Sequence, residues 1–368
     1  MKGWRSTPER LKLVVNMEMC ETIRKMTQYE WEASSESIAE RYGIPPERVM
    51  RFDTNTSPFK PEFNFKGVEL NEYPDPSYAN LRKLLSEYAG VPSDRIVVGA
   101  GADEILSVIA RVFLEKGDRA VISTPTYPMF RVVVEGSGEI ACEVQREDDF
   151  SLDEDALISQ VKERKAKLVF ICNPNNPTGN LSELKSIEKI AMGVNACVVV
   201  DEAYFEFCGR SSAKLLKKYE NIVVIRTFSK AFSLAGARIG YSLSSECIAE
   251  AMNRVRMPSS VSSLSVFLAE ESLKNKNRME RNVARIVAER KRLAEQLRRL
   301  GLEVFPSNAN FLLVRFKSAE YVFEKLIERG IVARKFSSDR LKDCLRFTVR
   351  NREENSLLLR ELGGVLDE

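Results

Sequence analysis

Lys230 is the residue around which a reactive set of side chains can be assembled. It lies in the run TFSKAFSLAGAR (227–238), with two hydroxyls just before it and the cation of Arg238 eight residues after it. Upstream stand a carboxylate, a phenol and an amide: Asp201, Tyr204 and Asn176. Pyridoxal phosphate (PLP) needs an amine for a Schiff base, donors and a cation for its phosphate, an anion at its ring nitrogen and partners for its ring oxygen. The sequence therefore predicts a PLP site.

The lysine and the carboxylate each have an ordinary alternative. Most lysines are exposed surface residues, and a carboxylate at a strand end is often an ion pair or a helix cap. Phe228 and Phe232 favour partial burial of Lys230, which would lower the pKa of its amine and favour a Schiff base. Asp201 follows four apolar residues, and a buried carboxylate is costly unless it is paired. A protonated ring nitrogen would pair it.

Two more polar turns follow predicted strands. The run GAGAD (99–103) joins a strand to a helix, and its backbone N–H groups could hold a phosphate. A tight turn with Asp103 as helix cap is the simpler interpretation of this run alone. The run TPTY (124–127) could place Tyr127 against a flat ring, although a core tyrosine is about as common.

Two arginines near the carboxyl end form a second candidate site. Arg334 and Arg346 lie in apolar, strand-like runs, where a guanidinium needs an anionic partner. A guanidinium can hold a carboxylate or a phosphate through two parallel hydrogen bonds. A bound substrate anion and an ion pair within the protein are both open at this point.

Composition excludes several other classes of function. The chain holds no histidine, so zinc hydrolases and Ser-His or Cys-His nucleophile systems are poor interpretations, and no metal site is predicted. The net charge is +3 with both signs mixed, which predicts no nucleic-acid partner. No apolar run is long enough for a membrane span, and residues 1–12 lack the apolar core of a secretion signal. Seven scattered cysteines indicate reduced thiols and a cytoplasmic protein.

The elements that must position these residues follow an α/β pattern. Short apolar, β-branched runs alternate with helical patterns between about 95 and 243: strands at 95–98, 120–123, 168–172, 197–200 and 222–226. Near-continuous apolar runs are typical of parallel strands with both faces buried, and ligands bind outside the carboxyl ends of such strands. A charged helical region at 266–300 and a tail with strands at 310–314 and 344–349 indicate a smaller α+β domain.

Together these motifs resemble those of fold-type-I, class I/II aminotransferases, and among them the histidinol-phosphate aminotransferase family. The similarity runs from about Tyr29 to Arg352. The Lys230 segment, NPNNPTG (173–179) and DEAY (201–204) are shared by the wider class. The narrower matches are MTQ before Tyr29, YPDP (73–76), GADE (101–104), Asn310 and LRFTV (345–349).

The resemblance implies a fold and a set of residue roles. The fold would be an α/β fold-type-I transferase: an arm at 1–60 that belongs partly to the small domain, a large PLP-binding domain at 61–254 with a mostly parallel seven-stranded sheet, and a small α+β domain at 255–368. Lys230 would bind PLP and move the substrate proton, with Asp201 and Tyr204 as the other catalytic residues. The implied cofactor contacts are Ala102, Asp103, Tyr127, Asn176, Asp201, Tyr204, Thr227, Ser229, Lys230 and Arg238, joined by Tyr73 of the neighbouring subunit. The implied substrate contacts are Tyr29, Asn55, Asn176, Arg334 and Arg346.

The implied reaction converts histidinol phosphate and 2-oxoglutarate to imidazole acetol phosphate and glutamate, in a homodimer with shared active sites. The chain departs from the family pattern near the substrate: TNTSP at 54–58, a helix-like insert at about 32–50, Ser259-Ser260 and Arg350. Two alternatives therefore stay open, a decarboxylase of an amino-acid phosphate such as threonine phosphate and an aromatic amino acid aminotransferase. A non-enzymatic regulator of the same fold fits less well, because every catalytic position is filled and no DNA-binding domain is appended.

Overall fold

The central element is a seven-stranded sheet. The computed structural model describes residues 23–24, 26, 33–66 and 68–368. The strand order is β2-β8-β7-β6-β5-β3-β4. The strands are β2 (Ile96–Gly99), β3 (Arg119–Thr124), β4 (Ile140–Gln145), β5 (Leu168–Cys172), β6 (Cys197–Asp201), β7 (Ile222–Thr227) and β8 (Gly240–Leu243). Strand β8 runs antiparallel to the other six strands of this sheet, which are parallel to one another. The predicted α/β fold with a mostly parallel seven-stranded sheet is confirmed.

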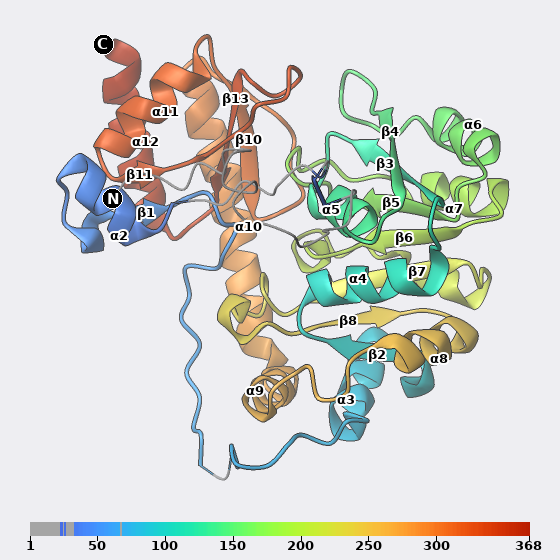
Figure 1. Ribbon diagram of the computed structural model, residues 1–368. Coiled ribbons are helices and arrows are strands. Elements are labelled where there is room, and N and C mark those ends of the chain that lie inside the picture. Colours follow the sequence, from blue (N-terminus) through green and yellow to red (C-terminus); the bar gives the residue numbers. More distant parts are fainter. Residues whose placement is uncertain (1–22, 25, 27–32, 67) are drawn as a thin grey trace, which may run out of the picture.

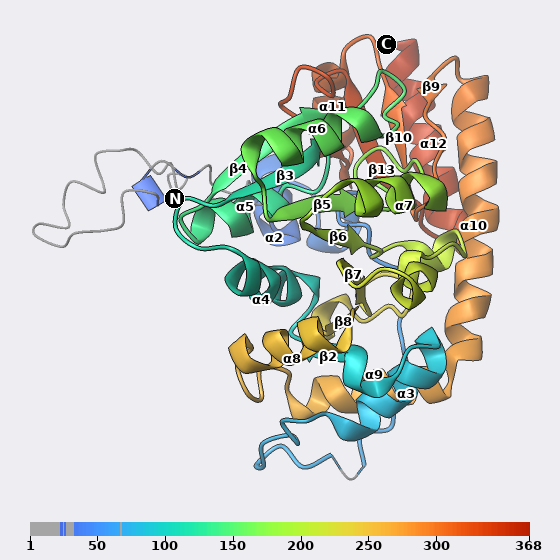
Figure 2. The same ribbon diagram turned by 90° about the vertical axis from the view of Figure 1, so that its right-hand side faces the viewer.

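Helices cover both faces of this sheet (Figure 1, Figure 2). One side carries α4 (Ala102–Phe113), α5 (Met129–Gly136) and α8 (Glu246–Val255). The other side carries α3 (Ala79–Ala89), α6 (Glu154–Arg164), α7 (Leu184–Gly193), α9 (Ser263–Lys274) and α10 (Lys276–Arg299). Val198 and Val199 of β6 are both fully buried, one in each core. Burial on both faces is the reason why the strands read as continuous apolar runs.

A second, antiparallel sheet lies beside the carboxyl ends of the large one (Figure 1). Its order is β12-β13-β10-β9, with β9 (Glu303–Val304), β10 (Phe311–Arg315), β12 (Arg334–Lys335) and β13 (Cys344–Thr348). Helices α11 (Ala319–Glu328) and α12 (Arg352–Asp367) pack together on this part. Helix α12 begins with a capping box in which Asn351 and Glu354 satisfy each other's backbone N–H groups. The predicted smaller α+β unit is thus present, while the domain limits at 60 and 254 stay a prediction.

The amino-terminal part forms a separate two-stranded sheet with β11 (Ile331–Val332). Helix α2 (Ser35–Tyr42) begins at the cap Ser34, and a 3₁₀ turn over Pro46–Arg48 follows. Strand β1 (Met50–Arg51) then pairs in parallel with β11. The insert expected at 32–50 is therefore a short helix and a strand, and Ile38 packs against Ile327 and Val332.

Several elements differ from the prediction. The charged helical region at 266–300 is two helices, α9 and α10, which meet at Asn275. Strands β4 and β8 lie outside the predicted set, because β4 is a partly exposed edge strand and β8 has only four residues. No helix within the described part of the chain combines the length and the hydropathy of a membrane span.

Candidate active site

A cavity of about 830 Å³ opens at the carboxyl ends of the parallel strands. The large sheet, the segment 53–56 and the small sheet all contribute to its wall. The predicted residues that line it are Asn55, Ala102, Asp103, Tyr127, Asn176, Asp201, Tyr204, Thr227, Ser229, Lys230, Arg238, Arg334 and Arg346. The chain thus brings together side chains that lie up to almost 300 residues apart in the sequence, as expected for a ligand site at this edge of an α/β sheet.

Two further predicted residues were assigned to the site. Tyr29 lies outside the described residues. Tyr73 is 90% exposed and is absent from the wall, so it has no contact with the cavity of its own chain. The cofactor contact predicted for Tyr73 therefore requires a second subunit and stays a prediction.

Lys230 follows β7 and reaches the cavity from a turn anchored by buried aromatic rings. Phe228 is fully buried and Phe232 is 5% exposed, and their rings pack 4.7 Å apart between centroids. The amine of Lys230 donates a hydrogen bond to the backbone oxygen of Thr54 at 3.1 Å. Burial, with the cation of Arg346 as a second cause, lowers the pKa of Lys230 to about 8. About a tenth of this amine is therefore neutral, and so nucleophilic, at pH 7, far more than for an exposed lysine.

Asp201 ends β6 and is 2% exposed. Its Oδ1 accepts a hydrogen bond from the backbone N–H of Ala203 at 2.9 Å. Burial raises the pKa of Asp201 to about 7, because the charged carboxylate is poorly solvated there. A cation placed against this carboxylate would favour its charged form. A protonated ring nitrogen is such a cation, and the carboxylate would in turn stabilise its charge.

Tyr204 lies three residues after Asp201, with its ring edge against Phe311. Its hydroxyl accepts a hydrogen bond from Nδ2 of Asn55 at 3.1 Å, and burial raises its pKa above the usual value. Asn55 has a positive φ of 55° and is fixed from two sides. Its N–H donates to Oγ1 of Thr348 at 2.9 Å, and its backbone oxygen accepts from Nδ2 of Asn310 at 2.9 Å. The residue predicted as a substrate contact thus also orients the phenol of Tyr204.

A cluster of donors lies between β2, β7 and the start of α4. The hydroxyl of Thr227 donates to Ser229 Oγ at 2.9 Å, and Arg238 pairs with Asp103 at 2.9 Å. The hydroxyl of Tyr127 also donates to Asp103, at 3.0 Å. The helix cap is Gly101, not Asp103, with a positive φ of 85°. Because a Cβ there would lie 2.7 Å from Nη2 of Arg238, only glycine lets this guanidinium lie against the helix start.

This cluster fits a phosphate. Free backbone N–H groups at the start of α4, two hydroxyls and a guanidinium are the donors that a phosphate group uses. Asp103 is the anion that Arg238 holds in the described structure, and its carboxylate lies at the mouth of the same cluster. The donor set, together with the buried carboxylate of Asp201 and the amine of Lys230, therefore matches the cofactor that the sequence predicts.

Two arginines face each other at the other end of the cavity. Arg334 of β12 lies directly opposite Arg346 of β13 in the antiparallel register, so both side chains are on the same face of the small sheet. Arg346 is 7% exposed and donates to Oδ1 of Asn176 and to the backbone oxygen of Asp53. A carboxylate or phosphate placed between two guanidiniums on one face of a sheet can accept hydrogen bonds from both. This end of the cavity is therefore suited to an acidic group.

The sequence reasoning missed part of the wall. The segment 335–341, from the last residue of β12 into the loop before β13, lines the cavity. Arg340 holds it against the large sheet by donating to the backbone oxygens of Arg146 and Glu147 at 2.5 and 2.6 Å. The contact between the amine of Lys230 and the backbone oxygen of Thr54 was also not predicted. Neither has a sequence signal, because one is an irregular loop and the other is a main-chain group.

Comparison with known proteins places this site in a family. The sequence matches the family described as aminotransferase class I and II over residues 50–362. The chain belongs to this aminotransferase family. It is 40% identical over 330 residues to the histidinol-phosphate aminotransferase of Ruminiclostridium cellulolyticum, a match that covers 86% of this chain and 92% of that protein. It is 39% identical over 318 residues to the protein of the same name from Thermococcus gammatolerans, covering 84% and 90%.

A solved aminotransferase structure has the same fold. The crystal structure of histidinol-phosphate aminotransferase from Sinorhizobium meliloti in complex with pyridoxal-5'-phosphate matches this chain with a TM-score of 0.88 at 28% sequence identity. The match covers 96% of this chain and 99% of that chain. The resemblance to histidinol-phosphate aminotransferases seen in the sequence motifs is confirmed.

Proposed function

We propose that this aminotransferase is PLP-dependent and moves an amino group between histidinol phosphate and 2-oxoglutarate. When bound, PLP supplies a ring that withdraws electrons from the substrate carbon bearing the amino group. Asp201 would hold the ring nitrogen, and Tyr204 and Asn176 the ring oxygen. The start of α4, with Thr227, Ser229 and Arg238, would hold the cofactor phosphate.

The residues of the chain would then carry the proton steps. Lys230 is suited to remove and return the proton at the substrate carbon, because the lowered pKa of its amine puts the acid and base forms in comparable amounts near pH 8. The segment 335–341 and the side chains of the small sheet would exclude water from this carbon.

The observation that carries the choice of substrate is the position of Arg334 opposite Arg346 in the cavity wall. A carboxylate fills one guanidinium fork, whereas a phosphate with two charges can use both. The same receptor would therefore serve the carboxylate of glutamate in one half-reaction and the phosphate of the amino donor in the other. The names of the relatives from Ruminiclostridium and Thermococcus support the same donor.

Steady-state kinetics of both half-reactions would test this function. We expect turnover with histidinol phosphate and 2-oxoglutarate, and a much lower kcat/KM with histidinol, which lacks the phosphate. Equal use of histidinol and histidinol phosphate would overturn the assignment of the anion receptor. Release of carbon dioxide from an amino-acid phosphate, without consumption of 2-oxoglutarate, would assign the decarboxylase reaction instead.

We also propose a homodimer and a cytoplasmic location. The exposed ring of Tyr73 and its family-like YPDP context support a site completed by a second subunit. All six cysteines in the described part of the chain are free, which suits a reducing compartment.

A further inference from the structure

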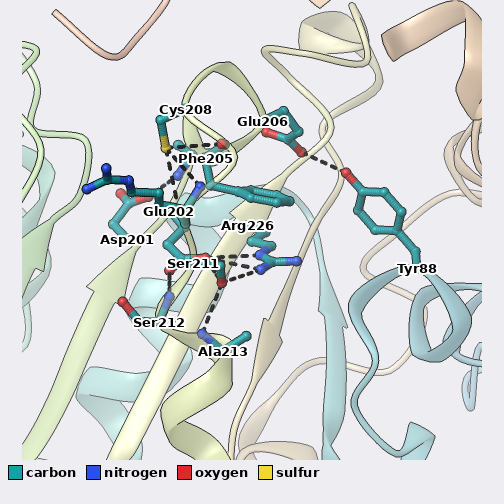
Figure 3. Close-up of polar contacts among 12 residues, drawn as sticks. Tyr88, Asp201, Glu202, Phe205, Glu206, Cys208, Ser211, Ser212, Ala213 and Arg226 are labelled. Atoms are coloured by element: carbon teal, nitrogen blue, oxygen red, sulfur yellow. Dashed lines mark hydrogen bonds and ion pairs between the residues drawn. The ribbon is translucent and has the colours of Figure 1, made fainter. Parts of the chain in front are cut away.

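Behind the cavity wall, the ends of β6 and β7 are joined by a buried ion pair between Glu202 and Arg226 (Figure 3). The side chain of Glu202 is 0% exposed and that of Arg226 is 4% exposed. Nε and Nη2 of Arg226 both donate to Oε2 of Glu202 at 3.2 Å. Glu202 directly follows Asp201, and Arg226 directly precedes Thr227, yet neither member of the pair lines the cavity. The pair therefore lies one residue behind two groups assigned to the cofactor.

Further contacts make this pair part of a connected block. The hydroxyl of Ser211 donates to Oε2 of Glu202 at 2.7 Å and accepts from Nη2 of Arg226 at 2.6 Å. The backbone N–H of Ser212 donates to Oε1 of Glu202. The guanidinium of Arg226 also lies 3.6 Å from the centroid of the Phe205 ring (Figure 3). The ends of two strands and the loop that follows β6 are thus held by one set of polar contacts.

Stability alone is a weak reason for such a pair. Removing two charges from water is costly, and a well-packed apolar pair of similar volume is often equally stable or more so. The pair does, however, connect two segments with different tasks. Asp201 and Tyr204 stand on the β6 side, and Lys230 and its hydroxyl neighbours stand on the β7 side. A shift of one strand end against the other would move the carboxylate away from the amine, and errors of about 1 Å in such placements can cost about 100-fold in rate.

We propose that Glu202 and Arg226 are positioning residues whose ion pair fixes the β6 end against the β7 end, so that Asp201 and Lys230 hold one cofactor molecule together. The inference rests on the proposed function, because the cofactor is that of the proposed reaction. The pair also has no net charge, because the carboxylate of Glu202 offsets the guanidinium of Arg226. The ionisable groups that act on Asp201 and Lys230 are Asp103, Glu202, Arg238 and Arg346, and those that act on Arg226 are Glu202, Glu206 and Tyr241.

Variants can separate this role from simple support of the fold. In Glu202→Gln/Arg226→Met both charges are removed together and the volumes are nearly kept, so neither member of the pair is left buried and charged without the other. In Glu202→Gln alone, Arg226 stays as a cation next to the site. Ile190→Ala, in the buried face of α7 outside the cavity, is the matched control for loss of stability.

Two measurements report on the cofactor without reference to the amino donor. They are the Kd of PLP for cofactor-free protein and the pH midpoint of the visible absorption change of bound PLP. We expect the double variant to keep its thermal midpoint within about 4 °C of the wild type. Its affinity for PLP should nevertheless fall about tenfold or more. Glu202→Gln should move the absorption midpoint to lower pH, because the remaining cation disfavours the protonated form. Ile190→Ala should lower the thermal midpoint and leave the absorption midpoint unchanged.

The inference is overturned if the double variant binds PLP as the wild type does and keeps the same absorption midpoint. If the double variant does not fold, Ser211→Ala decides, since it retains the ion pair and removes only the bridging hydroxyl. A fall in PLP affinity of about threefold supports the positioning role, and an unchanged affinity overturns it. Failure of the wild type itself to bind PLP would instead overturn the proposed function.

Discussion

At the scale of single residues, burial moves two pKa values toward each other in one cavity. The pKa of Lys230 falls to about 8 and that of Asp201 rises to about 7, in both cases because the charged form loses solvation. Shifted pKa values in a cleft are typical of functional sites. The sequence could suggest burial of both groups, from Phe228 and Phe232 in one case and from the apolar run of β6 in the other.

Asp201→Asn should stabilise the cofactor-free protein and abolish its function. Unfolded aspartate has a pKa near 4, so between about pH 4 and pH 7 the folded wild type binds more protons than the unfolded chain, and its stability falls as the pH rises. Asparagine removes this loss and keeps the hydrogen bond from Ala203. We expect a gain of about 4 kcal/mol above pH 7 and almost none at pH 4, measured by urea unfolding of the cofactor-free protein. A gain that does not depend on pH would contradict the assigned cause.

The amine of Lys230 should react as a neutral nucleophile at unusually low pH. In cofactor-free protein, its rate of acylation by a small reagent should rise with a midpoint near pH 8, whereas exposed lysines have midpoints near pH 10.4. Arg346→Ala should move this midpoint upward, because a nearby cation that disfavours the charged amine is removed. Mass spectrometry of the Lys230 peptide at a series of pH values would measure both effects. A midpoint for Lys230 equal to that of the surface lysines would refute burial as the cause.

At the scale of elements, the segment before the large sheet is fixed to β13 and closes the site. Thr348 accepts the N–H of Asn55 and donates to the backbone oxygen of Phe52, while Arg346 donates to the backbone oxygen of Asp53. Lys230 contacts the same segment through the backbone oxygen of Thr54. The lysine on the large sheet and the arginine on the small one thus share a single strip of backbone.

Asn55→Gly and Asn55→Ala form a matched pair that separates backbone from side chain. Both variants lose the hydrogen bond to Tyr204, so both should lose activity by a similar factor, roughly fivefold to tenfold for one buried hydrogen bond. Only alanine also pays for the positive φ of this position, so Asn55→Ala should be less stable than Asn55→Gly by about 1 kcal/mol. Steady-state kinetics and chemical unfolding would measure the two effects. Equal stability of the variants would show that the left-handed conformation of Asn55 is not maintained.

The sequence predicts those parts of the structure in which the pattern of residues depends on a single strand or helix. Strand β5 has the predicted bounds, and β6 and β7 differ from them by one residue, because burial on both faces produces continuous apolar runs. Motifs that directly follow a strand were predicted to lie near one ligand, because ligands bind outside the carboxyl ends of parallel strands, and these motifs do line one cavity. The segment 335–341 could not be placed, because its position depends on Arg340 reaching across to the backbone after β4. A contact between two sheets leaves no local pattern in the sequence of either segment that makes it.

At the scale of the whole molecule, Tyr73 is a predicted cofactor contact that does not reach the cavity of its own chain. Tyr73 lies on an irregular segment before α3, and its side chain is exposed and outside the cavity. Large exposed apolar residues gather on the same segment, with Phe65 at 53% and Leu70 at 72% exposure. Exposed apolar groups of this kind mark a surface suited to another protein. The proposed homodimer would cover them and bring Tyr73 to the partner's cofactor phosphate.

Mixing two inactive parents tests whether the sites are shared. Lys230→Ala removes the amine of one site, and Tyr73→Phe removes only a hydroxyl. If Tyr73 serves the partner's site, a hybrid dimer has one site with both defects and one site with neither. Random exchange gives half hybrids, so about one quarter of all sites should regain full activity. If Tyr73 served its own chain, every hybrid site would carry one defect and mixing would restore nothing. Activity after subunit exchange, compared with each parent and with a mixture kept from exchanging, distinguishes these outcomes. A fully active monomer in sedimentation would contradict the shared site directly, because no second chain would then be needed to supply the hydroxyl.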